Sequence, residues 1–352
     1  MRVPFRLKIA SFSLDIRGHL ARLSVLADPC ADVVPLVRAR RQFLVGWSAG
    51  FLSAFQGCAV ADIKRSGRAA MIAPGVYMVA GSGGAADGGN LGRIGNAGFI
   101  VGKRGVIAID TGTSYAHGRE LLAAIREVTD QPVRVALVTH TRPEFLFGAA
   151  AFRERGIPVR MHSRTARLMA SRCETCLKTL RQTVGEDAMR GTEMYKPDQE
   201  FDASHQLDLI GRPVKLLYFG HSSGPGDIAV LDVETGVLYA GGLLDAQRVP
   251  DIQDSDLAGW SQALRDLQAM NVARVVPGHG AASSASLIMT VQRYLTQLEA
   301  RTHSLVAKGT SLLSVSEDGE LPEFESWDQY DTIHRRNAAI AFLRFERDLT
   351  FK

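Results

Sequence analysis

The sequence predicts an α/β fold in which helices are layered with two β-sheets. Short apolar runs of strand length alternate from Gly75 onward with segments of helical periodicity. Glycine-rich or polar turns separate these runs. Because strands and helices are mixed in both halves of the chain, a layered α/β domain is favoured over separate all-α and all-β regions.

The first half predicts a hairpin, a helix and a buried strand. The strands Ala97–Val101 and Val106–Ile109 flank a four-residue turn that begins and ends with glycine. Apolar positions at helical spacing predict a helix over 116–128. The run Val133–Val138, which changes from alternating to continuously apolar, predicts a buried strand.

The second half repeats this order and then becomes helical. Four runs have the length and composition of strands: Val214–Tyr218, Ile228–Asp232, Val237–Ala240 and Arg274–Val276. Three segments have helical periodicity: about 256–270, 285–308 and 329–348. The acidic stretch 309–328, with its Ser, Gly and Pro residues, predicts a surface loop.

Composition and charge exclude several classes of protein. The 352 residues are 46% hydrophobic and carry a formal net charge of +4, which is enough apolar chain for a core without disulfide or metal staples. Residues 1–42 carry a net +5, residues 43–61 are uncharged, and residues 62–352 carry −1. The body therefore offers no general phosphate-binding field, and we expect no nucleic-acid partner.

Residues 40–61 have the order of an export signal. Arg40 and Arg41 precede an apolar run over 43–55 and then the small residues Ala59-Val60-Ala61. This pattern resembles a twin-arginine signal, which implies a periplasmic protein with no stable membrane span after cleavage. The alternative is a membrane anchor formed by residues 43–61. Residues 1–39 are interpreted as an extension that reflects a start codon assigned too early.

Two cysteines, Cys173 and Cys176, form a Cys-x-x-Cys pair in the body of the chain. No second cysteine pair or histidine pair completes a zinc cage, and no thioredoxin-like βαβ pattern surrounds them. In a periplasmic protein a local disulfide would persist. We therefore favour a disulfide, with two free thiols in a helical turn as the alternative.

Polar clusters follow five of the predicted strands. Three of these clusters contain a histidine: His140, His221 and His279. Asp110 ends another strand, and Tyr239-Ala240-Gly241-Gly242 ends the fifth.

This order of motifs resembles the metallo-β-lactamase-fold hydrolases over residues 75–282. The resemblance implies an αββα sandwich over 62–284, with residues 285–352 as C-terminal helices packed on it, and a site for one or two zinc ions. The SoxH-like, quinoprotein-relay branch is the most similar, through the leader, Arg248-Val249-Pro250 and Ile333–Asn337. That branch implies periplasmic dehydrogenase or cytochrome pathway partners.

The metal-ligand motif departs from the family pattern His-x-His-x-Asp-His. It reads His140, Arg142, Glu144 and Phe145 here, and Gly242 stands where the bridging aspartate is expected. A guanidinium has no acceptor and stays protonated, so Arg142 does not ligate a metal. The two-metal site is therefore expected to be absent.

Two functional interpretations remain. In the first, a hydrolase holds at most one zinc ion through His140, His221, His279 and Glu144, with Glu144 as fourth ligand or general base and Asp110 as a supporting carboxylate. Asp245 is a candidate replacement for the lost bridging carboxylate. In the second, a metal-free accessory protein uses Arg142 to bind a small anionic ligand, or pairs Arg142 with Glu144 as a purely structural contact.

Overall fold

The computed structural model describes residues 67–350 of the chain. The predicted extension (1–39) and export signal (40–61) lie outside the described residues. Across residues 67–350, no helix combines the length and the apolar character that a membrane crossing requires.

A seven-stranded sheet is formed by the first part of the described chain, with its strands in sequential order. The first four strands pair antiparallel, and β4 to β7 pair parallel. Its strands are β1 (Ala69–Ala73), β2 (Val76–Val79), β3 (Ala97–Gly102), β4 (Gly105–Ile109), β5 (Val133–Leu137), β6 (Val159–His162) and β7 (Gln199–Phe201).

A five-stranded sheet follows, in the order β12-β11-β10-β9-β8. Only the β11–β12 pair is parallel. Its strands are β8 (His205–Leu207), β9 (Val214–Tyr218), β10 (Ile228–Asp232), β11 (Val237–Tyr239) and β12 (Arg274–Val276).

The helices cover the outer faces of the two sheets. The larger sheet carries α1 (Tyr115–Val128), α3 (Ala149–Arg153) and α4 (Ser163–Val184), with the short α2 (Pro143–Leu146) at its edge. The smaller sheet carries η1 (Gly241–Leu243), α5 (Leu257–Gln268) and α6 (Ser286–Ala307). The remaining C-terminal elements pack beyond α6, away from the sheet: η2 (Leu312–Ser314), α7 (Val315–Asp318), η3 (Pro322–Phe324), η4 (Tyr330–His334) and α8 (Arg335–Thr350).

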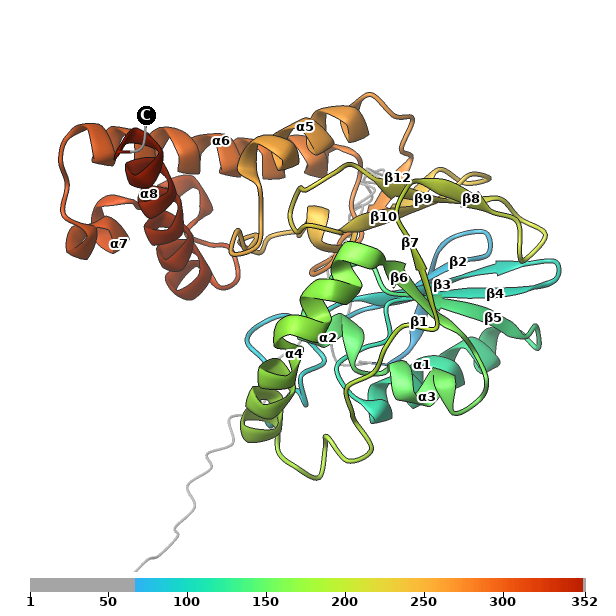
Figure 1. Cartoon of the computed structure of the whole chain (residues 1–352). Helices are drawn as coiled ribbons and strands as arrows, with labels where there is room; N and C mark the ends of the chain where they lie inside the picture. The colour runs from blue at the N-terminus through green and yellow to red at the C-terminus, as the bar shows by residue number, and fades with distance from the viewer. Residues whose placement is uncertain (1–66, 351–352) are drawn as a thin grey trace, which may run out of the picture. The chain divides into compact units, whose positions relative to one another are not determined.

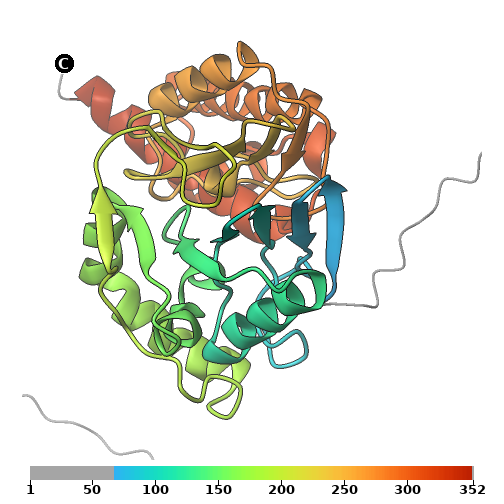
Figure 2. The ribbon, with the colours of Figure 1, turned by 90° about the vertical axis from the view of Figure 1, so that its right-hand side faces the viewer.

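The strands bury both faces, which gives four layers. Phe99 packs toward the helices of the larger sheet, whereas its neighbour Ile100 packs into the core between the sheets. Ile107 and Leu137 share that central core with Leu216 of the other sheet. Figure 2 shows the two sheets facing each other between their helices. The predicted αββα sandwich with C-terminal helices is confirmed.

The predicted surface loop over 309–328 is wrong. This stretch contains η2, α7 and η3, and it buries Val315, Leu321 and Phe324 against α6 and α8. Acidic residues lie between these apolar residues, so the overall composition of the stretch did not indicate that any of it is buried. Trp260 of α5 is fully buried in the core beside the smaller sheet.

One buried ion pair ties the two sheets together. Arg212 donates to both carboxylate oxygens of Asp232 at 2.5 and 2.6 Å, and its guanidinium also reaches the carbonyls of Pro74 and Val101. Asp232 is fully buried and Arg212 is 7% exposed.

We predict that Asp232→Asn lowers the free energy of unfolding by about 3 kcal/mol, because it removes the buried counterion of Arg212 and leaves only the half-exposed Glu234, at 3.6 Å. Urea denaturation measures this loss. The exposed pair Arg126–Asp130 is the control, and Asp130→Asn should change stability by no more than about 0.5 kcal/mol. An equal loss of stability from Asp232→Asn and Asp130→Asn would contradict the conclusion that the buried pair ties the two sheets together.

Candidate functional site

Four of the predicted site residues follow the carboxyl ends of strands. His140 follows β5, His221 follows β9, His279 follows β12 and Asp110 follows β4. The structure brings His279 into contact with Glu144, but it holds the other two histidines in separate hydrogen-bond arrangements.

His279 lies between two carboxylates. Its Nδ1 is 2.8 Å from Asp245 Oδ1 and its Nε2 is 3.1 Å from Glu144 Oε1. Burial alone would lower the pKa of His279, but Asp245 and Glu144 outweigh it and raise that pKa. Burial would raise the pKa of Glu144, and the hydrogen bond and charge of His279 instead bring it to about 2. Each ring nitrogen of His279 thus faces a carboxylate oxygen, and both donate when the ring is protonated.

Asp110 is linked to His140 by hydrogen bonds through Thr139. It is 4% exposed, sits in the left-handed region at φ 59°, and accepts hydrogen bonds from the backbone N–H and hydroxyl of Thr139. Thr139 Oγ1 is 2.7 Å from His140 Nδ1. Burial raises the pKa of Asp110 to about 7, and burial together with the charge of Arg142 lowers that of His140 to about 3.

Phe145 and Gly242 fill the space around these histidines. The fully buried ring of Phe145 is 4.3 Å from the ring of His140 and 5.2 Å from that of His279, centroid to centroid. A Cβ at Gly242 would lie 2.7 Å from Asp227 Oδ2 and 3.0 Å from His140 Cδ2. An aspartate at position 242 would therefore clash in this arrangement.

His221 faces a different partner. Its side chain is exposed, and its Nε2 is 2.7 Å from the backbone carbonyl of Asp254. Asp254 in turn forms an ion pair with Arg172 of α4. The structure does not bring His221 together with His140, His279 and Glu144.

Arg142 binds Asp251 rather than Glu144. Its guanidinium donates to the Asp251 carboxylate and, at 2.8 Å, to the Asp251 backbone carbonyl. Arg336, at the start of α8, donates to the same carboxylate. Burial would raise the pKa of Asp251, but the two arginines hold it below its usual range. The predicted contact between Arg142 and Glu144 is replaced by this cluster.

The donor set does not fit a metal ion as it is arranged. Over residues 67–350, no three His, Cys, Asp or Glu side chains are placed so that they could hold one. The contact of His279 Nδ1 with Asp245 is of the kind that metal-ligating histidines make through their other ring nitrogen. Its Nε2, however, faces Glu144 Oε1, so an ion would have to displace this contact and a ring proton to be bound there.

The predicted disulfide between Cys173 and Cys176 is wrong, since both are free thiols in the structure. The pair lies inside α4, three residues apart. Helix positions i and i+3 place their Cβ atoms about 5–6 Å apart, whereas a disulfide requires about 3.5–4.5 Å.

Sequence reasoning missed three charged residues of this region: Asp227, Asp251 and Arg336. Asp227 is 4% exposed, accepts from Ser223 Oγ at 2.7 Å, and has its pKa raised to about 6 by burial. Its position directly before a fully buried strand was the available signal for Asp227. No local pattern links Asp251 to Arg336, because 85 residues separate them.

Comparison with known proteins identifies the fold and the family. The metallo-beta-lactamase from Pontibacter korlensis superposes with a TM-score of 0.53 at 22% identity, over 65% of this chain and 98% of that one. TMB-1 (TM-score 0.53, 16% identity) and the DIM-1 metallo-beta-lactamase (0.52, 13%) each cover 65% of this chain, and 97% and 96% of their own.

A curated sequence relative matches only locally. The linear primary-alkylsulfatase of Pseudomonas sp. (strain ATCC 19151) is 35% identical over 54 residues, which are 15% of this chain and 10% of the sulfatase. The family model of the metallo-beta-lactamase superfamily matches residues 91–279, more than half of the chain. The chain therefore belongs to the metallo-beta-lactamase superfamily.

Proposed function

We propose that this hydrolase-like protein is a metal-independent binding or accessory protein that holds a small anionic ligand at its strand-end edge. The observation that supports this most directly is His279, which is held between Asp245 and Glu144 through both ring nitrogens. We therefore interpret His279, Asp245 and Glu144 as a fixed hydrogen-bonded group, called the polar wall below, rather than as a metal centre.

The cluster of Arg142, Arg336 and Asp251 supports an anionic ligand. Two guanidinium groups share one carboxylate, which leaves a net charge of +1. The side chains of Arg142 and Arg336 are 27% and 46% exposed, whereas that of Asp251 is 10% exposed. Guanidinium forks match carboxylate and sulfate oxygens. The local match to an alkylsulfatase agrees with an anion of this kind.

The alternative is a hydrolase with one metal ion. One observation favours it: within the described residues, His140 Nε2 has no hydrogen-bond partner, and neither does Glu144 Oε2. These two donors fall short of the three protein ligands of a catalytic zinc site. We therefore rank this function second.

We propose the same periplasmic location and quinoprotein-associated pathway that the sequence patterns suggest. The twin-arginine pattern over residues 40–61 supports export to the periplasm, and the resemblance to the quinoprotein-relay branch supports a partner among periplasmic dehydrogenases or cytochromes. Cell fractionation with the native leader and with Arg40→Lys/Arg41→Lys tests the export step.

Metal analysis tests the metal-independent proposal. We predict that full-length protein purified without chelator carries less than about 0.1 equivalents of zinc, iron or manganese by mass spectrometry, because His279 is held by two carboxylates and, of the described residues around it, only His140 Nε2 and Glu144 Oε2 remain without a partner, short of the three ligands that zinc requires. The His140→Ala/His221→Ala double variant should give the same value while remaining folded by circular dichroism. About one equivalent in the wild type, lost in the double variant, would establish the single-metal hydrolase instead.

Calorimetry with inorganic sulfate and with hexyl sulfate tests the anion site. We predict that Arg142→Gln and Arg336→Gln each weaken binding about tenfold, since each removes a charged hydrogen-bond donor. Arg335→Gln is the matched control, because Arg335 is 47% exposed next to Arg336 and pairs with Asp331. Unchanged affinity in the two test variants, or an equal loss in the control, would reject the site.

A further inference from the structure

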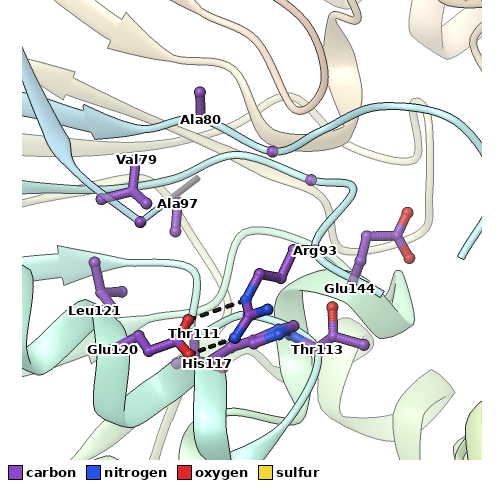
Figure 3. A pocket seen from close by; sticks show the side chains of 14 residues that line it. Val79, Ala80, Arg93, Ala97, Thr111, Thr113, His117, Glu120, Leu121 and Glu144 are labelled. Atoms are coloured by element: carbon purple, nitrogen blue, oxygen red, sulfur yellow. Dashed lines mark hydrogen bonds and ion pairs between the residues drawn. The ribbon is translucent and has the colours of Figure 1, made fainter. Parts of the chain in front are cut away.

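A small cavity of about 50 Å³ lies apart from the arginine cluster, beside the start of α1. The loop before β3, the residues after β4 and the first turns of α1 enclose it (Figure 3). Glu144 forms part of one wall, so the cavity adjoins the polar wall at the strand ends without including Arg142 or Asp251.

His117 supplies a hydrogen-bond donor in this cavity. It is 8% exposed, and its Nδ1 accepts the backbone N–H of Thr113 at 3.2 Å. Burial and the charge of Arg93 lower the pKa of His117 to about 3, so the ring is neutral. A neutral ring that accepts at Nδ1 carries its proton on Nε2. Among the described residues, no acceptor meets that N–H.

Arg93 supplies a positive charge in the same wall. It donates from Nε to Glu120 Oε2 at 3.0 Å and from Nη2 to the other Glu120 oxygen (Figure 3). The side chains of Arg93 and Glu120 are 26% and 46% exposed, so this pair is open to exchange with solvent or a competing anion. Nη1 of Arg93 has no partner among residues 67–350.

The rest of the cavity lining is apolar, and the volume of the cavity is small. Val79, Ala97 and Leu121 line it. Since one water-sized group needs about 10–15 Å³ of such volume, the cavity admits about three to five heavy atoms. Glu144 repels an anionic group at its own end, and Glu120 neutralises Arg93 at the other end, so an anion is held there only where it takes the place of the Glu120 carboxylate on Arg93.

We propose that this cavity binds a short-chain carboxylate, with its oxygens on His117 Nε2 and the Arg93 guanidinium and its alkyl chain against Val79, Ala97 and Leu121. The carboxylate replaces Glu120 as the partner of Arg93. This site is separate from the anion site at Arg142 and does not depend on it.

Titration of the full chain with acetate, propionate, butyrate and hexanoate, followed by ¹H–¹⁵N NMR, tests the proposal. Arg93→Gln should weaken propionate binding at least about tenfold, because the charged partner is lost. Glu120→Gln should strengthen it severalfold, because the competing carboxylate is gone. Affinity should fall from propionate, with five heavy atoms, to butyrate and hexanoate, with six and eight, because both exceed the limit of about five atoms that the cavity admits.

Two controls keep the result specific to this cavity. Arg126→Gln, on the same helix with a side chain that is 70% exposed, should leave propionate binding unchanged. Arg142→Gln should leave the propionate-induced shifts of the Val79, Ala97 and Leu121 amides unchanged, which separates this cavity from the anion site, where propionate can also bind. Leu121→Phe fills the apolar end and should abolish binding while the protein stays folded. Unchanged affinity in both Arg93→Gln and Glu120→Gln, or equal affinity for all four acids, would overturn the proposal.

Discussion

The arrangement of the ionisable side chains at the strand ends depends on the free-energy cost of burying charge beside the two sheets. An unpaired ion in such surroundings loses several kcal/mol of solvation, so each buried ionisable side chain must find a partner. His279 meets this requirement with Asp245 and Glu144, and Asp251 meets it with Arg142 and Arg336. Once these pairs form, the groups that would otherwise converge on an ion hold one another.

The departures from the superfamily motif act together. Arg142 turns away to Asp251, Phe145 places an aromatic ring against His140 and His279, and Gly242 leaves no room for a carboxylate beside Asp227. Each change alone would weaken a metal site by one ligand. In the structure they form a packed, hydrogen-bonded cluster at the strand ends of the sandwich.

The sequence predicts the fold well because strands and turns leave local patterns. The hairpin at Gly102–Gly105 and the buried strand β5 follow from runs of fewer than seven residues. The site is predicted only in part, since its pairings are long-range: Arg142 and Asp251 are 109 residues apart. The failed disulfide has a different cause. The Cys-x-x-Cys spacing does not reveal that it lies inside one continuous helix.

The protonation state of His279 distinguishes a histidine held by two carboxylates from a metal ligand. We would record long-range ¹H–¹⁵N spectra of the histidine rings near pH 7, before and after an excess of zinc is added. The account predicts that both ring nitrogens of His279 carry protons, since each faces a carboxylate at 2.8 or 3.1 Å, and that zinc leaves these signals unchanged. Loss of a ring proton from His279 on zinc addition, together with shifts of the His140 signals, would contradict this prediction and indicate that the two histidines form a metal centre.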